Sequence, residues 1–346
     1  MQAERPDLSE VPEAVRAYVE ALEAELARLQ APAPAPTAAA PPVEAEPPTT
    51  LQVITISHQG RAKRTARHYY SPQRRGGMGV FDLELPEPDR PAVLLVADVE
   101  DTLLLFSDQG RAFRLPVATL PEGDVRARGL QLGSRLPLRQ GERIVAALPA
   151  AGGVYVALLS ERGWVRRVRS SFFTGSMVPG LSFHDVAQGG PLVAACWTRG
   201  QGDLFLATRQ GQAIRFDETQ VSGRQGRLGL RVARDDAAVA VAAVDEASGV
   251  FLLSEDGKGT IRLMSGFRAN KAPGATGKLA LKTGRLVGAV TAGEDDHLFV
   301  ISNLSKIIRF AAAEIPPKEG VVQGVNVVSL RADEAAAVAV SPAVHE

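Results

Sequence analysis

The residues best suited to hold a ligand form one short run, Gln73-Arg74-Arg75-Gly76-Gly77-Met78-Gly79. The guanidinium groups of Arg74 and Arg75 can donate paired hydrogen bonds to phosphate oxygens. Three glycines within four residues let a backbone approach a ligand closely and offer its own amide groups. Composition alone fits a flexible basic loop that favours solubility equally well, so both interpretations stay open at this point.

Positive charge is concentrated around this run. The 39 basic and 39 acidic residues of the chain cancel, and the first 50 residues are acidic, with nine acids against three bases. From Leu51 to Phe81 the charged residues are all basic, namely Arg61, Lys63, Arg64, Arg67, Arg74 and Arg75. Because local density rather than total charge attracts phosphates, this segment favours nucleic-acid binding.

A repeated pattern positions these residues. Six times a Ser or Thr is followed three residues later by a turn residue, Gly or in the last repeat Ser305, and then by an arginine. These arginines are Arg64, Arg114, Arg167, Arg215, Arg262 and Arg309. The repeats begin 50, 53, 48, 46 and 48 residues apart, with one extra residue before Arg262. Periods of this length are typical of solenoids and propellers.

Each repeat predicts about four short strands. An apolar run precedes the turn, and the arginine then lies between apolar neighbours, so alternation places it on the opposite face of the sheet. In five repeats a Gly followed by an apolar residue comes 20 to 22 positions after the Ser or Thr, as at Gly79-Val80, whereas the fifth repeat has Gly277-Lys278-Leu279, and a last apolar strand ends the repeat. Six such units predict an all-β, six-bladed propeller-like ring over residues 51–346, closed so that few strand edges stay unpaired.

Two segments precede the ring. Within residues 1–30, Val15, Tyr18 and Leu22 form part of an apolar stripe with helical spacing, so we expect a short amphipathic helix. Such a helix either packs on its own protein, pairs with a second copy or docks on a partner. Residues 31–50 are rich in Pro and Ala and predict a disordered linker of polyproline character.

The run at residues 73–79 resembles the box motif of the C-terminal domain of DNA gyrase A, Gln-Arg-Arg-Gly-Gly-Lys-Gly, with Met78 in place of Lys. Residues Thr55–Arg67 and Leu103–Leu115 resemble the first two blades of that family, and the likeness covers all six repeats. The resemblance implies a β-pinwheel whose neighbouring blades exchange strands, and which wraps duplex DNA around a basic rim with the box required. In the related topoisomerase IV domain the fold is similar and the box is degenerate.

We therefore expect double-stranded DNA as the partner, bent or wrapped without sequence preference, so that the protein modulates DNA topology or assists a type II topoisomerase in the cytoplasm, at the nucleoid. The expected DNA-binding residues are Gln73, Arg74, Arg75, Gly76, Gly77, Gly79, Arg61, Lys63, Arg64, Arg67, Arg114, Arg166, Arg167, Arg215, Arg262 and Arg309. Residues 9–30 could bind part of a topoisomerase or another copy of the chain. The alternative is a protein-interaction propeller with weakened DNA affinity, which the zero net charge, Met78 and Ser305 motivate.

Other chemistry is not expected. The tyrosines lack the context of a DNA-cleaving enzyme, so we expect no catalysis, no cofactor and no small-molecule substrate. The single Cys196 excludes a disulfide within the chain and a thiolate metal cluster, and the histidines have no metal-ligand spacing. Residues 274–278 resemble a phosphate loop faintly, but Ala272 and Leu279 break the motif. No apolar run is long enough for a membrane span, and the N-terminus lacks a signal core.

Overall fold

The computed structural model describes residues 12–13, 15–16, 18–20, 22 and 46–342. The chain forms two compact units, residues 1–44 and 45–346. In the first unit, the described residues from 13 to 22 are helical, and Val15, Tyr18 and Leu22 are exposed. The remainder of the expected 1–30 helix, and residues 31–45 of the expected linker, lie outside the described residues.

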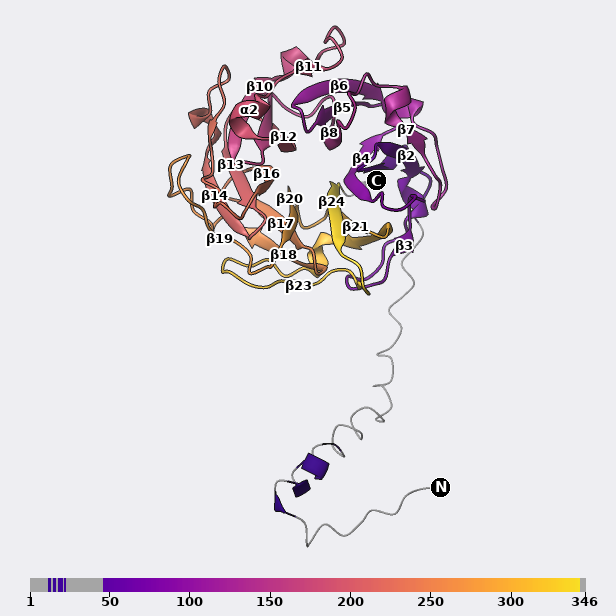
Figure 1. The fold of residues 1–346 in the computed structure, drawn as a ribbon, viewed down its shortest axis with the longest axis vertical. Helices are drawn as coiled ribbons and strands as arrows, with labels where there is room; N and C mark the ends of the chain where they lie inside the picture. The colour runs from indigo at the N-terminus through magenta and orange to yellow at the C-terminus, as the bar shows by residue number, and fades with distance from the viewer. Residues whose placement is uncertain (1–11, 14, 17, 21, 23–45, 343–346) are drawn as a thin grey trace. The chain divides into compact units, whose positions relative to one another are not determined.

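The second unit is a ring of six four-stranded antiparallel sheets, which confirms the expected six-bladed β-pinwheel (Figure 1). From the inner to the outer strand, blade 1 consists of β4 (Pro91–Asp98), β1 (Leu51–Ser57), β2 (Arg61–Ala66) and β7 (Leu130–Gln131). Blade 2 consists of β8 (Ile144–Pro149), β5 (Thr102–Ser107), β6 (Arg111–Pro116) and β11 (Leu181–Ser182). Blade 3 consists of β12 (Leu192–Thr198), β9 (Tyr155–Ser160), β10 (Trp164–Arg169) and β15 (Arg227–Leu228).

The other three blades repeat this order. Blade 4 consists of β16 (Ala238–Val244), β13 (Asp203–Thr208), β14 (Gln212–Asp217) and β19 (Lys278–Leu279). Blade 5 consists of β20 (Leu286–Thr291), β17 (Gly249–Ser254), β18 (Lys258–Leu263) and β23 (Val325–Asn326). Blade 6 consists of β24 (Ala335–Ser341), β21 (His297–Ser302), β22 (Lys306–Ala311) and β3 (Val80–Phe81). The short helices are η1 (Arg67–Tyr69), η2 (Val117–Thr119), η3 (Leu132–Ser134), η4 (Ser170–Phe173), α2 (Val186–Gly189), η5 (Glu218–Gln220) and η6 (Ala312–Glu314).

Every outer strand comes from the neighbouring repeat. The chain leaves the third strand of one blade, crosses the rim and adds two residues to the blade before it, and β3 closes the ring by pairing with β22. Glycines at the ends of these crossings let two backbones touch. A Cβ on Gly79, whose φ is +68°, would lie 2.5 Å from the carbonyl oxygen of Ile307, so the position excludes a side chain.

The repeated Ser or Thr builds the hairpin turn inside each blade. In blade 1, the amide of Gly60 donates to the carbonyl of Ser57 over 3.0 Å, and the buried Ser57 hydroxyl accepts from the amide of Arg61 over 3.0 Å. Gly60 has a φ of +82°. Ser305 takes the same left-handed conformation at +63°, and its hydroxyl accepts from the amide of Leu83 over 2.9 Å, which explains how a serine replaces glycine there.

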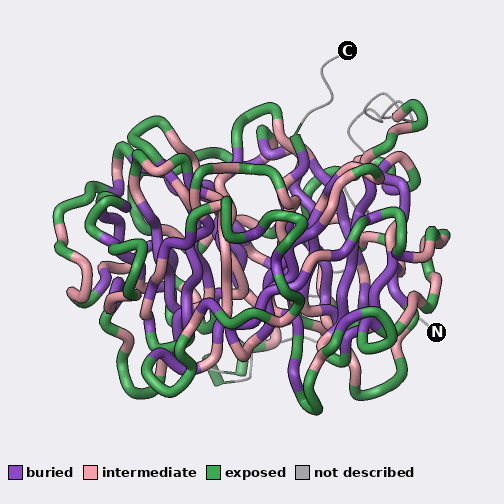
Figure 2. Tube along the Cα trace, turned by 90° about the horizontal axis from the view of Figure 1, so that it is seen from above, coloured by how far each residue is buried: buried purple, intermediate pink, exposed green. Residues whose placement is uncertain are grey.

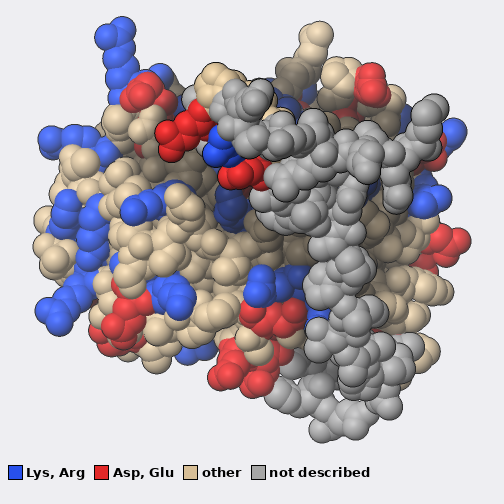
Figure 3. Space-filling view, turned by 90° about the horizontal axis from the view of Figure 1, so that it is seen from below, with Lys and Arg blue, Asp and Glu red and all other residues tan. Residues whose placement is uncertain are grey.

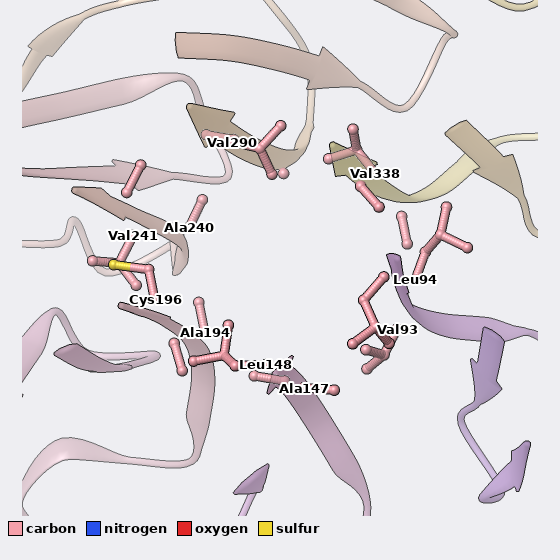
Figure 4. Close-up of a pocket in the computed structure, with 18 of the residues that line it drawn as sticks. Val93, Leu94, Ala147, Leu148, Ala194, Cys196, Ala240, Val241, Val290 and Val338 are labelled. Atoms are coloured by element: carbon pink, nitrogen blue, oxygen red, sulfur yellow. The ribbon is translucent and has the colours of Figure 1, made fainter. Parts of the chain in front are cut away.

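The core lies between neighbouring blades and fills the space from hub to rim. Apolar side chains from facing sheets form a cluster at each blade interface, and Figure 2 shows the resulting buried strands with exposed loops above and below them. The opening at the hub is lined by small apolar side chains of the six inner strands, such as Ala194, Ala240 and Val338 (Figure 4). Because each sheet is covered on both faces, neither face of a blade is a solvent surface.

Candidate nucleic-acid interface

The Gln73–Gly79 box, the run at residues 73–79, is the segment that crosses from blade 1 to blade 6. Its backbone is fixed to the neighbouring blades, since the amide of Gln73 donates to the carbonyl of Arg309 over 2.7 Å. The amide of Gly76 donates to the carbonyl of Val327 over 2.8 Å. The box is therefore an ordered part of the rim that spans the outer edges of blades 6 and 5.

The glycines of the box serve this course of the backbone. Gly76 has a φ of +80°, and a Cβ on Gly77 would lie 2.7 Å from Oε1 of Gln73 and 3.2 Å from the carbonyl oxygen of Arg74. Together with Gly79, they allow the chain to turn tightly and lie flat on blade 6. Their expected contact with DNA stays a prediction, because their conformations already account for the residue type.

The two arginines of the box differ in freedom. Arg74 is exposed, and no hydrogen bond or ion pair of its side chain is found within residues 46–342. Arg75 is also exposed, but its Nε donates to the carbonyl of Glu314 over 3.0 Å and its Nη1 to that of Asn326 over 3.3 Å. Arg74 is thus the box cation best placed to meet an incoming phosphate, and Met78 of the same run is 59% exposed.

The six hairpin arginines, one per blade, do not project from the rim, and the expectation that they form a surface ring is wrong. Arg167, Arg215, Arg262 and Arg309 are all buried, and Arg64 and Arg114 are partly buried. Alternation does place them opposite the apolar neighbours. However, the opposite face of each sheet packs against the next blade, so these side chains point into an interface instead of into solvent.

Most of these guanidinium groups are neutralised inside the ring. Arg167 bonds the carboxylate of Glu218 over 3.0 Å and lies 4.8 Å from the ring centre of Tyr155. Arg215 bonds Asp203 over 2.6 Å and Glu246 over 2.9 Å. Arg64 pairs with Glu122 over 3.1 Å, whereas Arg114 donates to the carbonyl of Phe173. Such pairs hold neighbouring blades together and leave little capacity for phosphate.

Lys63 and Arg67, also expected to bind DNA, are the two largest fully buried side chains of the ring. Lys63 bonds Asp82 over 2.8 Å, and Arg67 donates to the hydroxyl of Ser341 over 2.6 Å. Both therefore join blade 1 to other segments, and their proposed role at the surface is wrong. Arg61 and Arg166 are only partly buried, and Nη1 of Arg166 donates to the carbonyl of Phe183 over 2.8 Å.

Glu46 lies at the contact between blades 6 and 1, where the ring closes, which we call the seam. Its carboxylate bonds both Arg67 and Arg309, and the other side of Arg309 donates from Nε to Nδ1 of His297 over 2.9 Å. Burial would raise the pKa of Glu46, but the two arginines outweigh it and the pKa is lowered. Burial, together with the charges of Arg309 and Arg67, lowers the pKa of His297 to about 4.

The exposed cations lie instead on the segments that cross between blades. We call these the crossover segments: residues 71–79, 121–129, 174–180, 222–228, 268–278 and 316–324. Their exposed bases are Arg74, Arg75, Arg126, Arg128, Arg224, Arg268 and Lys318, and their partly exposed bases are Arg227, Lys271 and Lys278. Sequence reasoning omitted most of them, although each segment could have been located by its fixed distance from the hairpin turn.

This basic belt, the set of bases on the crossover segments, is uneven around the ring. On the part of the face that Figure 3 leaves uncovered, Lys and Arg gather on the side where Figure 1 draws β14 and β19. The crossover segment 174–180 contains no charged residue. Beside it Phe172 and Val178 are 58% and 69% exposed. The belt is therefore interrupted by an apolar stretch where blade 3 crosses to blade 2, and in the segment 316–324 the exposed Glu319 follows the single base Lys318.

The described residues offer little else for chemistry. Cys196 lines the hub, and burial raises the pKa of its thiol to about 12, which makes the thiolate rare. No group of three potential metal ligands occurs among the residues whose positions are given. Tyr70 is buried and its hydroxyl donates to Asp82, so it is a packing residue. Within the described part of the chain no helix is long and apolar enough to cross a membrane.

The family model for the "DNA gyrase C-terminal domain, beta-propeller" matches residues 52–90, 101–151, 202–245 and 296–319. The ring belongs to the gyrase C-terminal-domain family. The matched segments cover most of blades 1, 2 and 4 and the central hairpin of blade 6. Within this gyrase-type ring, the three inner strands of blade 3 and all of blade 5 are outside the matched segments, and the crossover segments that leave these two blades are respectively uncharged and most basic.

Curated relatives of the gyrase-type ring are components of DNA gyrase. The DNA gyrase A protein of Deinococcus deserti is 32% identical over 296 residues, which cover 80% of this chain and 36% of that protein. The DNA gyrase A protein of Salmonella typhimurium is 30% identical over 293 residues, which cover 82% of this chain and 33% of that protein. The chain thus spans about a third of the length of these relatives.

Solved structures share the architecture of this gyrase-type ring. A DNA gyrase A C-terminal domain superposes with a TM-score of 0.74 at 22% identity, covering 84% of this chain and 99% of that one. The C-terminal domain of a DNA topoisomerase IV superposes with a TM-score of 0.59 at 21% identity, covering 85% and 94%. At these identities the likeness establishes the fold alone.

Proposed function

We propose that the ring binds duplex DNA through the exposed bases of its crossover segments, bends the duplex along the rim and performs no bond-breaking step itself. The observation that carries this proposal is the basic belt. Arg74, Arg224 and Arg268 are exposed, come from three different crossover segments and have no carboxylate partner within residues 46–342. Membership of the gyrase C-terminal-domain family supports the same function.

Phosphate contacts of this kind explain both affinity and lack of specificity. Each contact releases counterions condensed on the duplex, so binding weakens steeply as salt rises. About six contacts would lower the affinity about a thousandfold between roughly 50 and 200 mM salt. Contacts to phosphates fix position without reading bases, so sequence preference would come only from the ease of bending.

The interruption at residues 174–180 shapes the proposed path. Smooth bending of 20–30 base pairs costs on the order of 1–6 kcal/mol, which rim contacts must outweigh. Five crossover segments carry bases and one carries none, so the duplex would follow an arc over blades 3 to 6 and blade 1 and leave the rim near blade 2. This geometry favours bending without a complete turn around the ring.

The decisive experiment measures binding and topology together. Affinity for short and long duplexes is determined at several salt concentrations, because bending along an arc requires length whereas a point contact does not. Nicked circles are then ligated with the protein bound, and the change in linking number is read from gels. Double replacement R74A/R75A should abolish that change and leave the melting temperature within about 2 °C. Equal affinity for both lengths, or unaltered linking numbers with R74A/R75A, would count against the proposal.

We further propose that the ring works with a type II topoisomerase, since its curated relatives are components of DNA gyrase. Addition of the chain to a gyrase supercoiling assay should change the rate or extent of supercoiling, and the R74A/R75A protein should not. A chain that binds and bends DNA yet leaves the assay unchanged would place its role elsewhere on the chromosome. The chain alone should leave supercoiled plasmid uncut.

A second candidate function is a protein-interaction platform. The specific observation in its favour is the apolar rim at Phe172, Val178 and Leu181, all exposed and next to the uncharged crossover segment. Under this alternative, the V178D protein would lose a partner while keeping its DNA affinity. Under the first proposal V178D would lower DNA affinity only slightly, because no phosphate contact is removed.

A further inference from the structure

Arg262 differs from the other hairpin arginines because its guanidinium group has no hydrogen-bond partner among the described residues. It is 5% exposed, and its Nε and Nη1 are buried without a hydrogen bond. No side-chain hydrogen bond or ion pair of Arg262 is found in the described ring, whereas Arg167, Arg215 and Arg309 all bind carboxylates. An unpaired charge at such a depth is costly, and an anion beside the guanidinium group would lower that cost.

Other cations converge on the same place. Lys278 Nζ lies 4.2 Å and Arg262 Cζ lies 5.7 Å from the ring centre of Phe267. Burial and the charges of Arg262, Lys271, Arg215 and Arg268 lower the pKa of Lys278. Burial likewise lowers the pKa of Arg262. The free guanidinium therefore belongs to a group of like charges that repel one another.

Little negative charge compensates this group. Arg215 is neutralised by its own carboxylates, but Lys278 Nζ donates to the carbonyl of Arg268 over 3.1 Å and Lys271 Nζ to that of Thr276 over 2.7 Å. The carboxylate of Glu319 influences Arg262, yet it is exposed and forms no ion pair within the part of the chain described. Carbonyl contacts fix the loop 268–278 without removing its net charge.

Glycines set the course of this loop, and the amide of Gly274 donates to the carbonyl of Gly229 over 2.9 Å. Gly274 has a φ of +85°, and Gly277 passes so close to β14 that a Cβ would lie 2.8 Å from the carbonyl oxygen of Ala213. Residues 274–278 are the run that resembles a phosphate loop only faintly. It leads into strand β19 and not into a helix, so it is unsuited to a nucleotide triphosphate in the manner of that motif.

We infer that Arg262, Lys278 and Arg268 bind the oxygens of one phosphate group where blade 5 crosses to blade 4. If this phosphate belongs to a DNA backbone, the site is one contact of the proposed DNA-binding surface, and the inference rests on the proposed function. Where it belongs to a free phosphate ion, the site stands alone. All three residues lie outside the segments that match the gyrase family model, so the site is a property of this chain's own fifth repeat.

The first experiment uses inorganic phosphate and the full chain. Thermal unfolding is followed in sodium phosphate and in sodium chloride at equal pH and ionic strength. A ligand of the native state raises the melting temperature in a saturable way. The R262M protein should lose that rise, and in chloride it should melt no lower than the unmodified chain because an unpaired buried charge has been removed. Arg90→Met, an exposed arginine of blade 1, is the matched control and should respond to phosphate fully.

The second experiment asks whether DNA supplies the phosphate. The logarithm of the dissociation constant is plotted against the logarithm of the salt concentration, and one lost phosphate contact lowers the slope by about one. A reduced slope for R262M supports a DNA phosphate in the site. An unchanged slope combined with a lost phosphate response supports a free phosphate ion. If R262M fails to fold, Lys278→Gln takes its place in both experiments.

The inference is overturned if R262M keeps both the phosphate response and the slope of the unmodified chain. It is also overturned if the unmodified chain shows no phosphate response and the two proteins have equal slopes. Failure of the proposed function looks different, because then the unmodified chain binds no DNA at all while the phosphate response still reports on the site.

Discussion

The arginines of the hairpins and those of the crossover segments lie in opposite environments in one ring. Arg167 and Arg215, on central strands, are buried and bound to carboxylates, whereas Arg74, Arg224 and Arg268, on the rim, are exposed. The difference teaches that position in the blade, and not residue type, decides whether an arginine stabilises the fold or meets a ligand. Replacement should therefore affect stability in the first group and DNA affinity in the second.

The largest effect is expected from the crossover segments. The triple replacement R74A/R224A/R268A should lower the affinity for duplex DNA about a hundredfold near 100 mM salt and reduce the salt slope by about three, since three phosphate contacts are lost. Fluorescence anisotropy on a long duplex measures both quantities. The matched control is R90A/R199A/R331A, which removes three exposed arginines outside the crossover segments. An equal loss in the control would show that net charge alone governs binding.

The next largest effect tests the hairpin group at the seam. Glu46→Gln leaves Arg67 and Arg309 without their carboxylate in a buried place, so it should lower the free energy of unfolding by about 2–3 kcal/mol. Urea unfolding measures this change. Glu84→Gln, which removes the exposed partner of Arg128, should leave the free energy of unfolding nearly unchanged because solvent screens that pair. A stable E46Q protein would mean that the seam does not depend on this carboxylate.

Charge added to the uncharged crossover segment 174–180 tests whether exposed bases on these segments bind DNA. The S176R/V178R protein should bind long duplexes about tenfold more tightly, because two phosphate contacts become available on an exposed segment. The S176Q/V178Q protein keeps the size of the side chains without the charge and should bind as the unmodified chain does. No gain for S176R/V178R would place the DNA path away from blade 2.

His297 gives the hairpin group a dependence on pH. Its pKa is about 4 in the ring and about 6.5 in the unfolded chain, so between these values the unfolded state binds more protons. This contribution to stability is present above pH 6.5 and is lost as the pH falls toward 4. Linkage alone gives a loss of about 2 kcal/mol between pH 7 and pH 5, and because solvent screens this half-buried group we expect about 1 kcal/mol, measured by urea unfolding. The H297Q protein should show a smaller loss over the same interval, and an equal loss would assign the effect to other groups.

The smallest effect is expected at Met78. Met78→Lys restores the family's box motif on an exposed side chain and adds one cation to the box, so affinity should rise about threefold and the salt slope should increase by at most one. Met78→Gln is the uncharged control. A decrease for M78K would indicate that Arg74 and the new lysine compete for one phosphate.

The sequence predicted the architecture because its signals are local and repeated. One backbone conformation suits each of these signals, namely the turn at Ser57 and Gly60, its variant at Ser305 and the glycines that end the crossings. Six copies at similar spacing predict a ring. The exposed Arg74 also followed from its place in a polar, glycine-rich run. These segments were predictable because residues close to one another in the chain determine their conformation.

Burial of the hairpin arginines could not be predicted in the same way. Alternation separates two faces of a strand, but only packing between blades determines that both faces of each sheet are covered. The ion pairs show why. Arg167 binds Glu218 of the next blade, and Arg309 binds Glu46, which precedes the first strand of blade 1 in the chain. The absence of any such partner for Arg262 in the described ring was equally hidden, because it depends on what the neighbouring blade lacks.

Strand exchange has a consequence for how the ring is made. The outer strand of blade 6, Val80–Phe81, is synthesised more than 200 residues before its partner at Lys306 and Ile307. Until the final repeat leaves the ribosome, this early segment has no strand to pair with, so blade 6 cannot be completed before the last repeat is synthesised. Closure is then a single long-range event that depends on every intervening blade, so we expect slow, all-or-none assembly and little tolerance for the deletion of one repeat.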